Sequence, residues 1–494
     1  MKPAMKQYWM KNMKKTLLSI LPALLLVACG TAPRQPDAVV LTPTWQQAHV
    51  KDAAEASAAQ RALLPVARWW AALGDEQLTQ LIDEALARNT NLARAAWRVR
   101  SARLSAGNAA AGMWPSPSAS VDTRRSRRLD GEGATTRSAG ASVGLNWEID
   151  LWGRLAAQAD EAAWEAIATE YDREAAAQAL VATVAKSYWR IALLDAQIAA
   201  QRQSIETARK TLQLVQVQLE AGAVSPLEVA QSDQALASQQ ASLEDMLATR
   251  QALRHALAII FDVPPELLPA AAQSPRLPDS ATLPQIVAGV PAHMLARRPD
   301  VRAAELRLCA ALEGVRAANA AYYPRLSLTG ALGTASQSLS DVLKNPVLTL
   351  GAGLALPFID YARLKRNEGI AHSTYEQAIL SFREALYGAL VDVEDALSAR
   401  THLLAQEQAL TRSLAQAQRA EELTEVRWQA GAVSMSRWLD AQETRRRAQT
   451  SLLNMHYERA ANLVDSYQAL GGEPVLPEVD PPQDGSSDAA CCTP

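Results

Sequence analysis

The chain has 494 residues, of which 49% are hydrophobic but only 5% aromatic, so its apolar surface consists chiefly of Ala, Leu and Val. Small apolar residues of this kind favour helices that pack closely over long distances. The formal net charge is −3, and it falls to about −8 when the five lysines of the N-terminal segment described below are removed. The acidic balance argues against nucleic acid as a partner.

The cysteines and histidines form no pattern that indicates a catalytic or metal site. Cys309 lies in a helical pattern and the pair Cys491-Cys492 lies in a polar, proline-rich tail, with no spacing typical of a disulfide framework or a zinc site. The six histidines are scattered, and the sequence contains no glycine-rich phosphate loop and no nucleophile elbow. We therefore expect a protein that is not an enzyme and holds no metal or dissociable cofactor.

Residues 1–28 have the pattern of a lipoprotein signal peptide. Lysines precede an apolar run at 17–27 that is too short to span a bilayer, and small residues stand before Cys29. We expect cleavage behind Ala28 and covalent attachment of diacylglycerol and an N-acyl chain to Cys29, which holds the N-terminus in the membrane. The residue after Cys29 is Gly30 rather than Asp, which in lipoproteins favours sorting to the outer membrane. The alternative is an ordinary buried cysteine at position 29.

The chain contains an internal repeat with an offset of 209 residues. The string Ala-Gly-Ala-Val-Ser at 221–225 recurs at 430–434, and Pro115 matches Pro324 at the same offset. Several matches in register favour a duplication. The predicted organisation is a signal peptide (1–28), a lipidated N-terminal segment (29–73), a first repeat (74–270), a linker (271–283), a second repeat (284–473) and a disordered polar tail (474–494).

Each repeat contains two segments that alternate between apolar and polar residues, which is the pattern of a strand with one apolar and one wet face. In the segment 138–149, Ala141, Val143 and Leu145 alternate with polar or small residues. A length of about ten residues is typical of a membrane β-strand. An ordinary strand of a soluble sheet explains any single segment equally well. The predicted strands span about 118–128, 138–149, 326–334 and 347–356.

A very long helix is predicted after each strand pair, at about 154–220 and 363–429. Apolar residues recur with alternating spacings of three and four, as in a coiled coil, and no proline interrupts either segment. At 1.5 Å per residue such a helix is about 100 Å long. Turns at 221–226 and 430–435 then lead into a return helix. A single domain core cannot bury such rods, so we expect them to lie beside other long helices.

Four strands cannot close a membrane barrel, because the smallest closed barrels have about eight. An open sheet edge in lipid is prohibitively costly. The chain is therefore expected to oligomerise. A dimer would supply eight strands, and side chains would fill the interior of such a barrel. A trimer would supply twelve strands and leave a lumen.

The sequence resembles the outer membrane efflux protein family, the TolC-like outer membrane factors, and in particular their lipidated, NodT-type branch. The resemblance rests on Cys29, on the string Arg-Arg-Pro-Asp-Val-Arg-Ala-Ala-Glu at 297–305, on the two Ala-Gly-Ala-Val-Ser turns and on Ala-Leu-Gly-Gly at 469–472. It implies a mainly α fold with a transmembrane β part, in which a trimeric, 12-stranded β-barrel continues into a 12-helix coiled-coil α-barrel.

The resemblance also implies a function. The protein would be the passive outer-membrane exit channel of a tripartite efflux pump that expels small molecules such as drugs. Its partners would be two further copies of the chain, a periplasmic membrane-fusion adaptor, an inner-membrane transporter of the resistance-nodulation-division (RND) class and outer-membrane lipid. Two alternatives are an exit duct for protein secretion and a periplasmic coiled-coil lipoprotein that forms no channel.

Two groups of candidate site residues follow from the resemblance. In the family, the turns are periplasmic tips that dock onto the adaptor, and an aspartate matching Asp440 points into the bore as a ring that narrows the closed tip. Ser436 and Arg437 stand near Asp440, where some relatives have apolar or acidic residues. The bland alternatives are plain helix turns and a solvated surface aspartate. The matching tip residues are Ala221, Gly222, Ala223, Val224, Ser225, Ala430, Gly431, Ala432, Val433 and Ser434.

A group of arginines marks the expected tip of the first strand hairpin. Arg124, Arg125, Arg127 and Arg128 precede Asp130-Gly131, a sequence typical of a tight turn. Contact with lipopolysaccharide phosphates and a merely solvated loop are equally good interpretations of this group.

Overall fold

The computed structural model describes residues 68–127, 135–273, 275–278, 283, 297–336 and 346–471. Several parts of the chain discussed above lie outside the described residues. They are the signal peptide with Cys29, the expected hairpin tip at 128–131, residues 274 and 279–282 of the linker, and the tail with Cys491 and Cys492.

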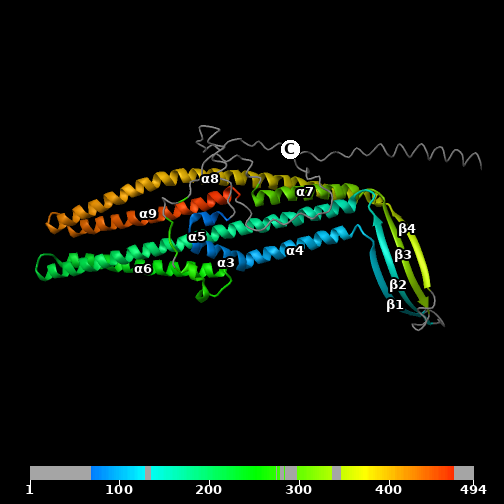
Figure 1. The fold of residues 1–494 in the computed structure, drawn as a ribbon, viewed down its shortest axis with the longest axis horizontal. Coiled ribbons are helices and arrows are strands. Elements are labelled where there is room, and N and C mark those ends of the chain that lie inside the picture. Colours follow the sequence, from blue (N-terminus) through cyan, green and yellow to red (C-terminus); the bar gives the residue numbers. More distant parts are fainter. Residues whose placement is uncertain are drawn as a thin grey trace, which may run out of the picture. The chain divides into compact units, whose positions relative to one another are not determined.

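The described part of the chain is mainly helical, with one β-sheet (Figure 1). The first half contains η1 (Trp69–Leu73), α3 (Glu76–Arg88), α4 (Thr90–Ala111), β1 (Ser116–Arg127), β2 (Thr135–Ile149), α5 (Arg154–Glu220), α6 (Pro226–Ile260), η2 (Pro265–Leu267) and η3 (Ala270–Ala272). The second half contains α7 (Pro299–Ala320), β3 (Arg325–Ser336), β4 (Pro346–Ala355), η6 (Pro357–Asp360), α8 (Tyr361–Gln429) and α9 (Met435–Ala469).

The two longest helices have 67 residues in α5 and 69 in α8, which corresponds to about 100 Å each at 1.5 Å per residue. Helix α5 packs against α3, α4, α6, α7 and α9, and α8 packs against α7 and α9 (Figure 1). Alanine is the commonest of the residues buried along α5, and its small side chain lets neighbouring helices approach closely. No described helix combines the length and hydropathy needed to cross a membrane.

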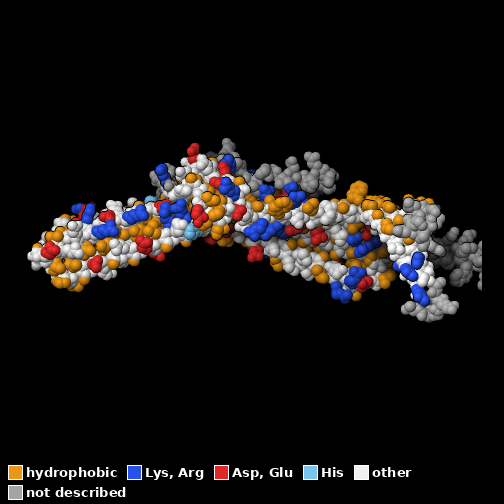
Figure 2. Space-filling model, turned by 90° about the horizontal axis from the view of Figure 1, so that it is seen from below, with side chains coloured by type: hydrophobic (Ala, Val, Ile, Leu, Met, Phe, Trp, Pro, Cys, Tyr) orange, Lys and Arg blue, Asp and Glu red, His pale blue; other side chains and the backbone are white. Residues whose placement is uncertain are grey.

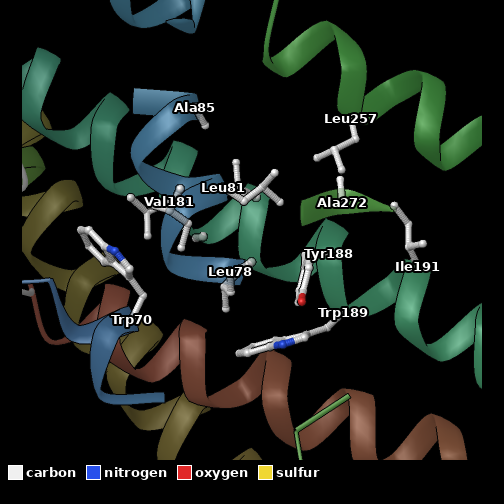
Figure 3. Packing of buried hydrophobic residues seen from close by; sticks show 14 of the residues in the cluster. Trp70, Leu78, Leu81, Ala85, Val181, Tyr188, Trp189, Ile191, Leu257 and Ala272 are labelled. Atoms are coloured by element: carbon white, nitrogen blue, oxygen red, sulfur yellow. The ribbon is translucent and has the colours of Figure 1, made fainter. Parts of the chain in front are cut away.

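The largest hydrophobic cluster lies where η1 and α3 meet the middle of α5 and the ends of α6 and α9 (Figure 3). Trp70, Tyr188 and Trp189 are almost completely buried in it. Trp69 stacks on Tyr467 of α9 with ring centroids 4.8 Å apart. Both tryptophans of η1, which the sequence-based division assigns to the N-terminal segment 29–73, are therefore part of the helical core.

The four strands form one antiparallel sheet in the order β1-β2-β3-β4. Strand β2 pairs with β3 although α5, α6 and α7 separate them in sequence, so both halves of the chain contribute to one sheet. All four strands overlap the segments predicted from alternation, with ends that differ by a few residues.

Aspartates connect the sheet to both long helices. The Asp150 carboxylate accepts hydrogen bonds from the backbone N–H groups of Arg154 and Ala156, each 2.8 Å long, at the start of α5. Asp360 caps α8 in the same way through the N–H of Arg363, at 3.4 Å. The carboxylates satisfy backbone donors that a helix N-terminus leaves free, so they fix the points where strand becomes helix.

Candidate functional site

The strand register sorts the side chains of the sheet into an apolar and a polar face. Leu145 of β2 lies opposite Pro117 of β1 and Gly330 of β3, and Gly330 in turn lies opposite Leu350 of β4. The large residues of the apolar face are exposed; the side chain of Leu350, for example, has a relative solvent accessibility of 77%. A contiguous apolar surface of this kind marks a membrane or protein contact. Its exposed members include Val121, Val143, Leu145, Leu328, Leu332, Leu348, Leu350 and Leu354.

The opposite face of the sheet carries hydroxyl groups and glycines. Ser118 lies opposite Gly144, and Thr329 lies opposite Gly351. A Cβ atom at Gly351 would come within 2.8 Å of the Thr329 hydroxyl, and one at Gly144 within 2.9 Å of the Ser118 hydroxyl. The hydroxyl side chains therefore lie flat across the glycines instead of projecting from the sheet. This arrangement suits the polar wall of a lumen, as in membrane barrels.

Exposed aromatic rings gather where the strands meet the helices. Trp152, just after β2, stacks on Tyr323, just before β3, with ring centroids 4.8 Å apart. Its indole N–H donates a 2.9 Å hydrogen bond to the carbonyl of Pro324. Trp114 and Tyr361 are exposed at the starts of β1 and α8. Tryptophan and tyrosine favour the boundary between lipid and water, and membrane barrels carry girdles of them. No sequence pattern predicted this belt, although Trp114 and Tyr323 directly precede Pro115 and Pro324.

Strands β1 and β4 are the two outer strands of the sheet, and each pairs on one side only among the described residues. The free edges expose backbone N–H and C=O groups over 12 residues of β1 and 10 of β4. Such edges bind further strands readily, and in lipid they must be paired. The sheet is thus a segment that other strands must complete.

At the far ends of the long helices, the two predicted turns have the same geometry. Gly222 and Gly431 adopt φ values of 75° and 72°. The N–H of Ala223 donates to the carbonyl of Gln218, and the N–H of Ala432 donates to that of Arg427, each at 2.8 Å. This is the Schellman arrangement that ends a helix at a glycine. No heavy atom would lie within 4 Å of a Cβ at either position, so glycine is required there by the positive φ and not by lack of space.

A small hydrophobic cluster joins the two turns. Val215 of α5, Trp428 of α8, and Met435 and Trp438 of α9 are buried together, and valines 224 and 433 of the turns pack against them. The two tryptophan rings stack with centroids 4.3 Å apart. We call this set the tip cluster. It holds both tips side by side within one chain, and no local sequence pattern predicted it.

The candidate gate residues lie on the first turns of α9. Asp440 is exposed in the single chain and lines, with Ser436, a groove of about 300 Å³ whose opposite walls include Thr207 of α5 and Gln231 of α6. Arg437 is also exposed but is not part of this groove, and it forms no ion pair within the described ranges. Ser436 and Asp440 therefore line the same groove, and Arg437, although adjacent to Ser436, does not.

Charged side chains continue along α9 beyond Asp440. Arg446 binds both carboxylate oxygens of Glu443 at 2.7 Å, and Arg447 adds a third contact at 2.6 Å. Partial burial by itself would raise the pKa of Glu443, but hydrogen bonds and charge attraction from the two arginines hold the pKa below its usual value. Arg445 forms an ion pair with Glu421, which links α9 to α8. The groove is thus bordered by fixed charges on the α9 side.

Comparison with known proteins finds relatives along nearly the whole chain. The pyoverdine export outer membrane protein OpmQ of Pseudomonas putida is 32% identical over 92% of this chain and 97% of its own length. Outer membrane protein OprJ of Pseudomonas aeruginosa is 30% identical over 92% of this chain and 95% of its own length. A solved structure of the channel CusC covers 90% of this chain and 100% of its own, with a TM-score of 0.77 and 26% identity.

The model of the family described as outer membrane efflux protein matches residues 81–260 and 290–472. The two matched ranges include all four strands, both long helices and both tips. The chain therefore belongs to the outer membrane efflux protein family: it is a TolC-like efflux channel of the outer membrane with a helical extension into the periplasm, and not an enzyme.

Proposed function

We propose that three copies of this chain form one 12-stranded barrel that continues into a 12-helix α-barrel built from two tandem repeats per chain. The observation that carries the proposal is a four-stranded sheet with two open edges and one exposed apolar face. Pairing β4 of one copy with β1 of the next removes every edge. Two copies would give eight strands with a filled interior, whereas three leave a lumen lined by the hydroxyl and glycine face.

The duct we propose is passive and serves a tripartite pump that expels small molecules such as drugs. The names of the relatives associate them with different cargoes, pyoverdine for OpmQ and cations for CusC. A common exit duct with a separate selecting pump explains that spread. An inner-membrane RND transporter supplies the energy, and a periplasmic adaptor joins it to the tips. Both glycine turns, Ala221–Ser225 and Ala430–Ser434, are small and solvent-accessible at their centres, which suits them to end-on docking.

The proposed gate is a ring of three Asp440 carboxylates with Ser436 and Arg437 beside it. Like charges around one axis repel one another and attract cations, so the ring narrows the tip and selects against anions. Exposure of Asp440 in the single chain supports this role, because the carboxylate has no internal partner to neutralise it within the described residues.

Cleavage behind Ala28 and acylation of Cys29 complete the proposal. Two or three acyl chains bind a bilayer firmly, since each buried methylene contributes about 0.8 kcal/mol. The Cys29→Ser protein should then lack the mass of the acyl chains, which mass spectrometry of the mature protein measures directly.

Conductance of the purified protein in planar bilayers tests both the duct and the gate. We expect small, cation-selective openings for the wild type and a severalfold larger conductance for Asp440→Ala. The matched control is Asp233→Ala, which removes an exposed carboxylate of α6 outside the groove and should leave conductance unchanged. Conduction without a change in Asp440→Ala would refute the gate and keep the duct. Absence of any conductance, together with monomeric migration, would favour a non-channel lipoprotein.

A further inference from the structure

Three arginines lie on the apolar face of the sheet, at the end away from the helices. Arg125 of β1 has the same parity as Val121 and lies directly opposite Arg137 of β2, while Arg127 lies opposite Thr135. Arg124 alternates to the polar face, opposite Ser138. Figure 2 shows basic side chains on this end of the sheet. The group that the sequence presents as one arginine run is therefore divided between two faces.

The position of these arginines relative to the apolar band places them at a membrane boundary. On β2 the band runs over eleven residues from Ile149, near the aromatic belt, to Ala139. The ten steps between them, at about 3.3 Å each and tilted by about 40°, span roughly 25 Å, which is the height of the apolar band of a membrane barrel. Arg137 is the next residue of that face beyond Ala139. The arginines thus lie level with lipid headgroups at the outer surface.

The charge of this cluster has no counterpart in the described sheet. Arg125, Arg127 and Arg137 are exposed. The two acidic residues of the described strands, Asp122 and Glu148, alternate to the polar face. Like charges directly opposite each other on adjacent strands destabilise the pair. An anion bound between Arg125 and Arg137 removes that repulsion, and the planar guanidinium groups match a phosphate in a bidentate geometry.

We propose that Arg125, Arg127 and Arg137 form a binding site for the phosphate groups of a glycolipid in the outer leaflet, namely lipid A of lipopolysaccharide. The site rests on the proposed barrel, because only insertion in the membrane turns the apolar face toward lipid. A lipid phosphate fits better than free phosphate, since the acyl chains of the same molecule cover Val121, Val143 and Leu145 further along the same face. The bound lipid then anchors each barrel segment at its outer rim.

Native mass spectrometry of full-length protein released from outer membranes tests the site by counting lipid A per assembly. In a protein with Arg125, Arg127 and Arg137 all replaced by Gln, we expect affinity for added lipid A to fall about fivefold for each arginine removed. Arg124→Gln is the matched control for Arg125→Gln, because each variant removes one charge from β1, on opposite faces of the sheet. Replacement of the three residues by Lys keeps the charge but loses the planar bidentate geometry, so we expect it to restore only part of the affinity.

Two results would overturn the site: equal lipid A binding by the triple Gln variant and the wild type, or an equal loss in Arg124→Gln and Arg125→Gln. Competition by millimolar inorganic phosphate, with no preference for lipid A over phosphatidylglycerol vesicles, would show that free anion rather than lipid is the ligand and would also overturn it. Conductance is measured on the same preparations. A conducting variant that has lost lipid A keeps the duct, whereas a wild type that neither conducts nor inserts refutes the proposed function itself.

Discussion

The two helical tips share the same five-residue turn, but the helices that follow are held in different ways. At the first tip, Ser225 and Glu228 form a capping box: the N–H of Ser225 donates to the Glu228 carboxylate at 3.0 Å, and the Ser225 hydroxyl accepts from Leu227 at 3.3 Å. At the second tip, Ser434 makes no side-chain cap. Arg437, at the position equivalent to Glu228, has the wrong charge for a helix N-terminus.

Packing replaces capping at the second tip. Trp428 and Trp438 stack in the tip cluster, whereas Leu219 and Val229 stand at the equivalent positions of the first tip. A capping box forms within four consecutive residues, but the tryptophan stack needs α8, α9 and Val215 of α5 together. The first tip is therefore stabilised locally and the second by its neighbours. A rearrangement of α9 would have to disturb the tip cluster, whereas the cap of α6 would be untouched.

Of the changes that test the difference between the two tips, removal of the Trp438 ring should have the largest effect. We expect Trp438→Ala to destabilise the second tip by about 3–5 kcal/mol, because a buried indole is replaced by a cavity. Hydrogen exchange of the amides at 428–440 should then accelerate by at least a hundredfold, while exchange of the sheet stays the same.

Val229→Ala is the matched control at the first tip. Val229 packs at the periphery of the cluster, so its truncation should cost only about 1 kcal/mol. Equal acceleration in both variants would mean that the tips are stabilised alike and that the distinction between capping and packing is wrong.

Features that depend on local sequence could be predicted, whereas contacts between distant segments, such as the tryptophan stack, could not. Alternation in the strands and the absence of proline from the long helices are local properties, so the strands, α5 and α8 were predictable. Gly222 and Gly431 mark the turns because few other residues accept their φ. The pairing of Arg125 with Arg137 depends on hairpin register, and the burial of Trp69 depends on a helix nearly 400 residues further along the chain. Contacts of that kind leave no local pattern.

The two glycine turns should respond identically to substitution, unlike the helices that follow them. Gly222→Ala and Gly431→Ala each place a Cβ on a residue with positive φ and meet no steric obstacle. We expect each to destabilise its turn by about 1–2 kcal/mol, measured as protease sensitivity at the tip. Asparagine at either position should be milder, because it tolerates this conformation. A much larger cost at Gly431 alone would show that the tip cluster also constrains the turn.

Removal of the serine hydroxyl should distinguish the tips more subtly. Ser225→Ala breaks the capping box and should cost the start of α6 about 1 kcal/mol. Ser434→Ala removes a hydroxyl that contacts Ser436 at 3.0 Å and caps nothing, so α9 should be unaffected. Hydrogen exchange of the first-turn amides of both helices measures the two effects in parallel. Comparable fraying of α9 would reveal a cap that the second tip uses after all.

The smallest expected effect is a difference in acid sensitivity between the tips. A hydrogen bond from Ser225 and backbone N–H groups lower the pKa of Glu228 from its usual 4.5. A carboxyl whose pKa is lowered by folding stabilises the folded form above its unfolded pKa, and this contribution disappears as the pH falls through the folded pKa. The start of α6 should therefore fray more in wild type than in Glu228→Gln when the pH is lowered from 5 to 3, relative to each protein at pH 7. The start of α9 should give no such difference, since it has Arg437 in place of a capping carboxylate. A pH response of α6 that persists in Glu228→Gln would assign that response to another carboxylate.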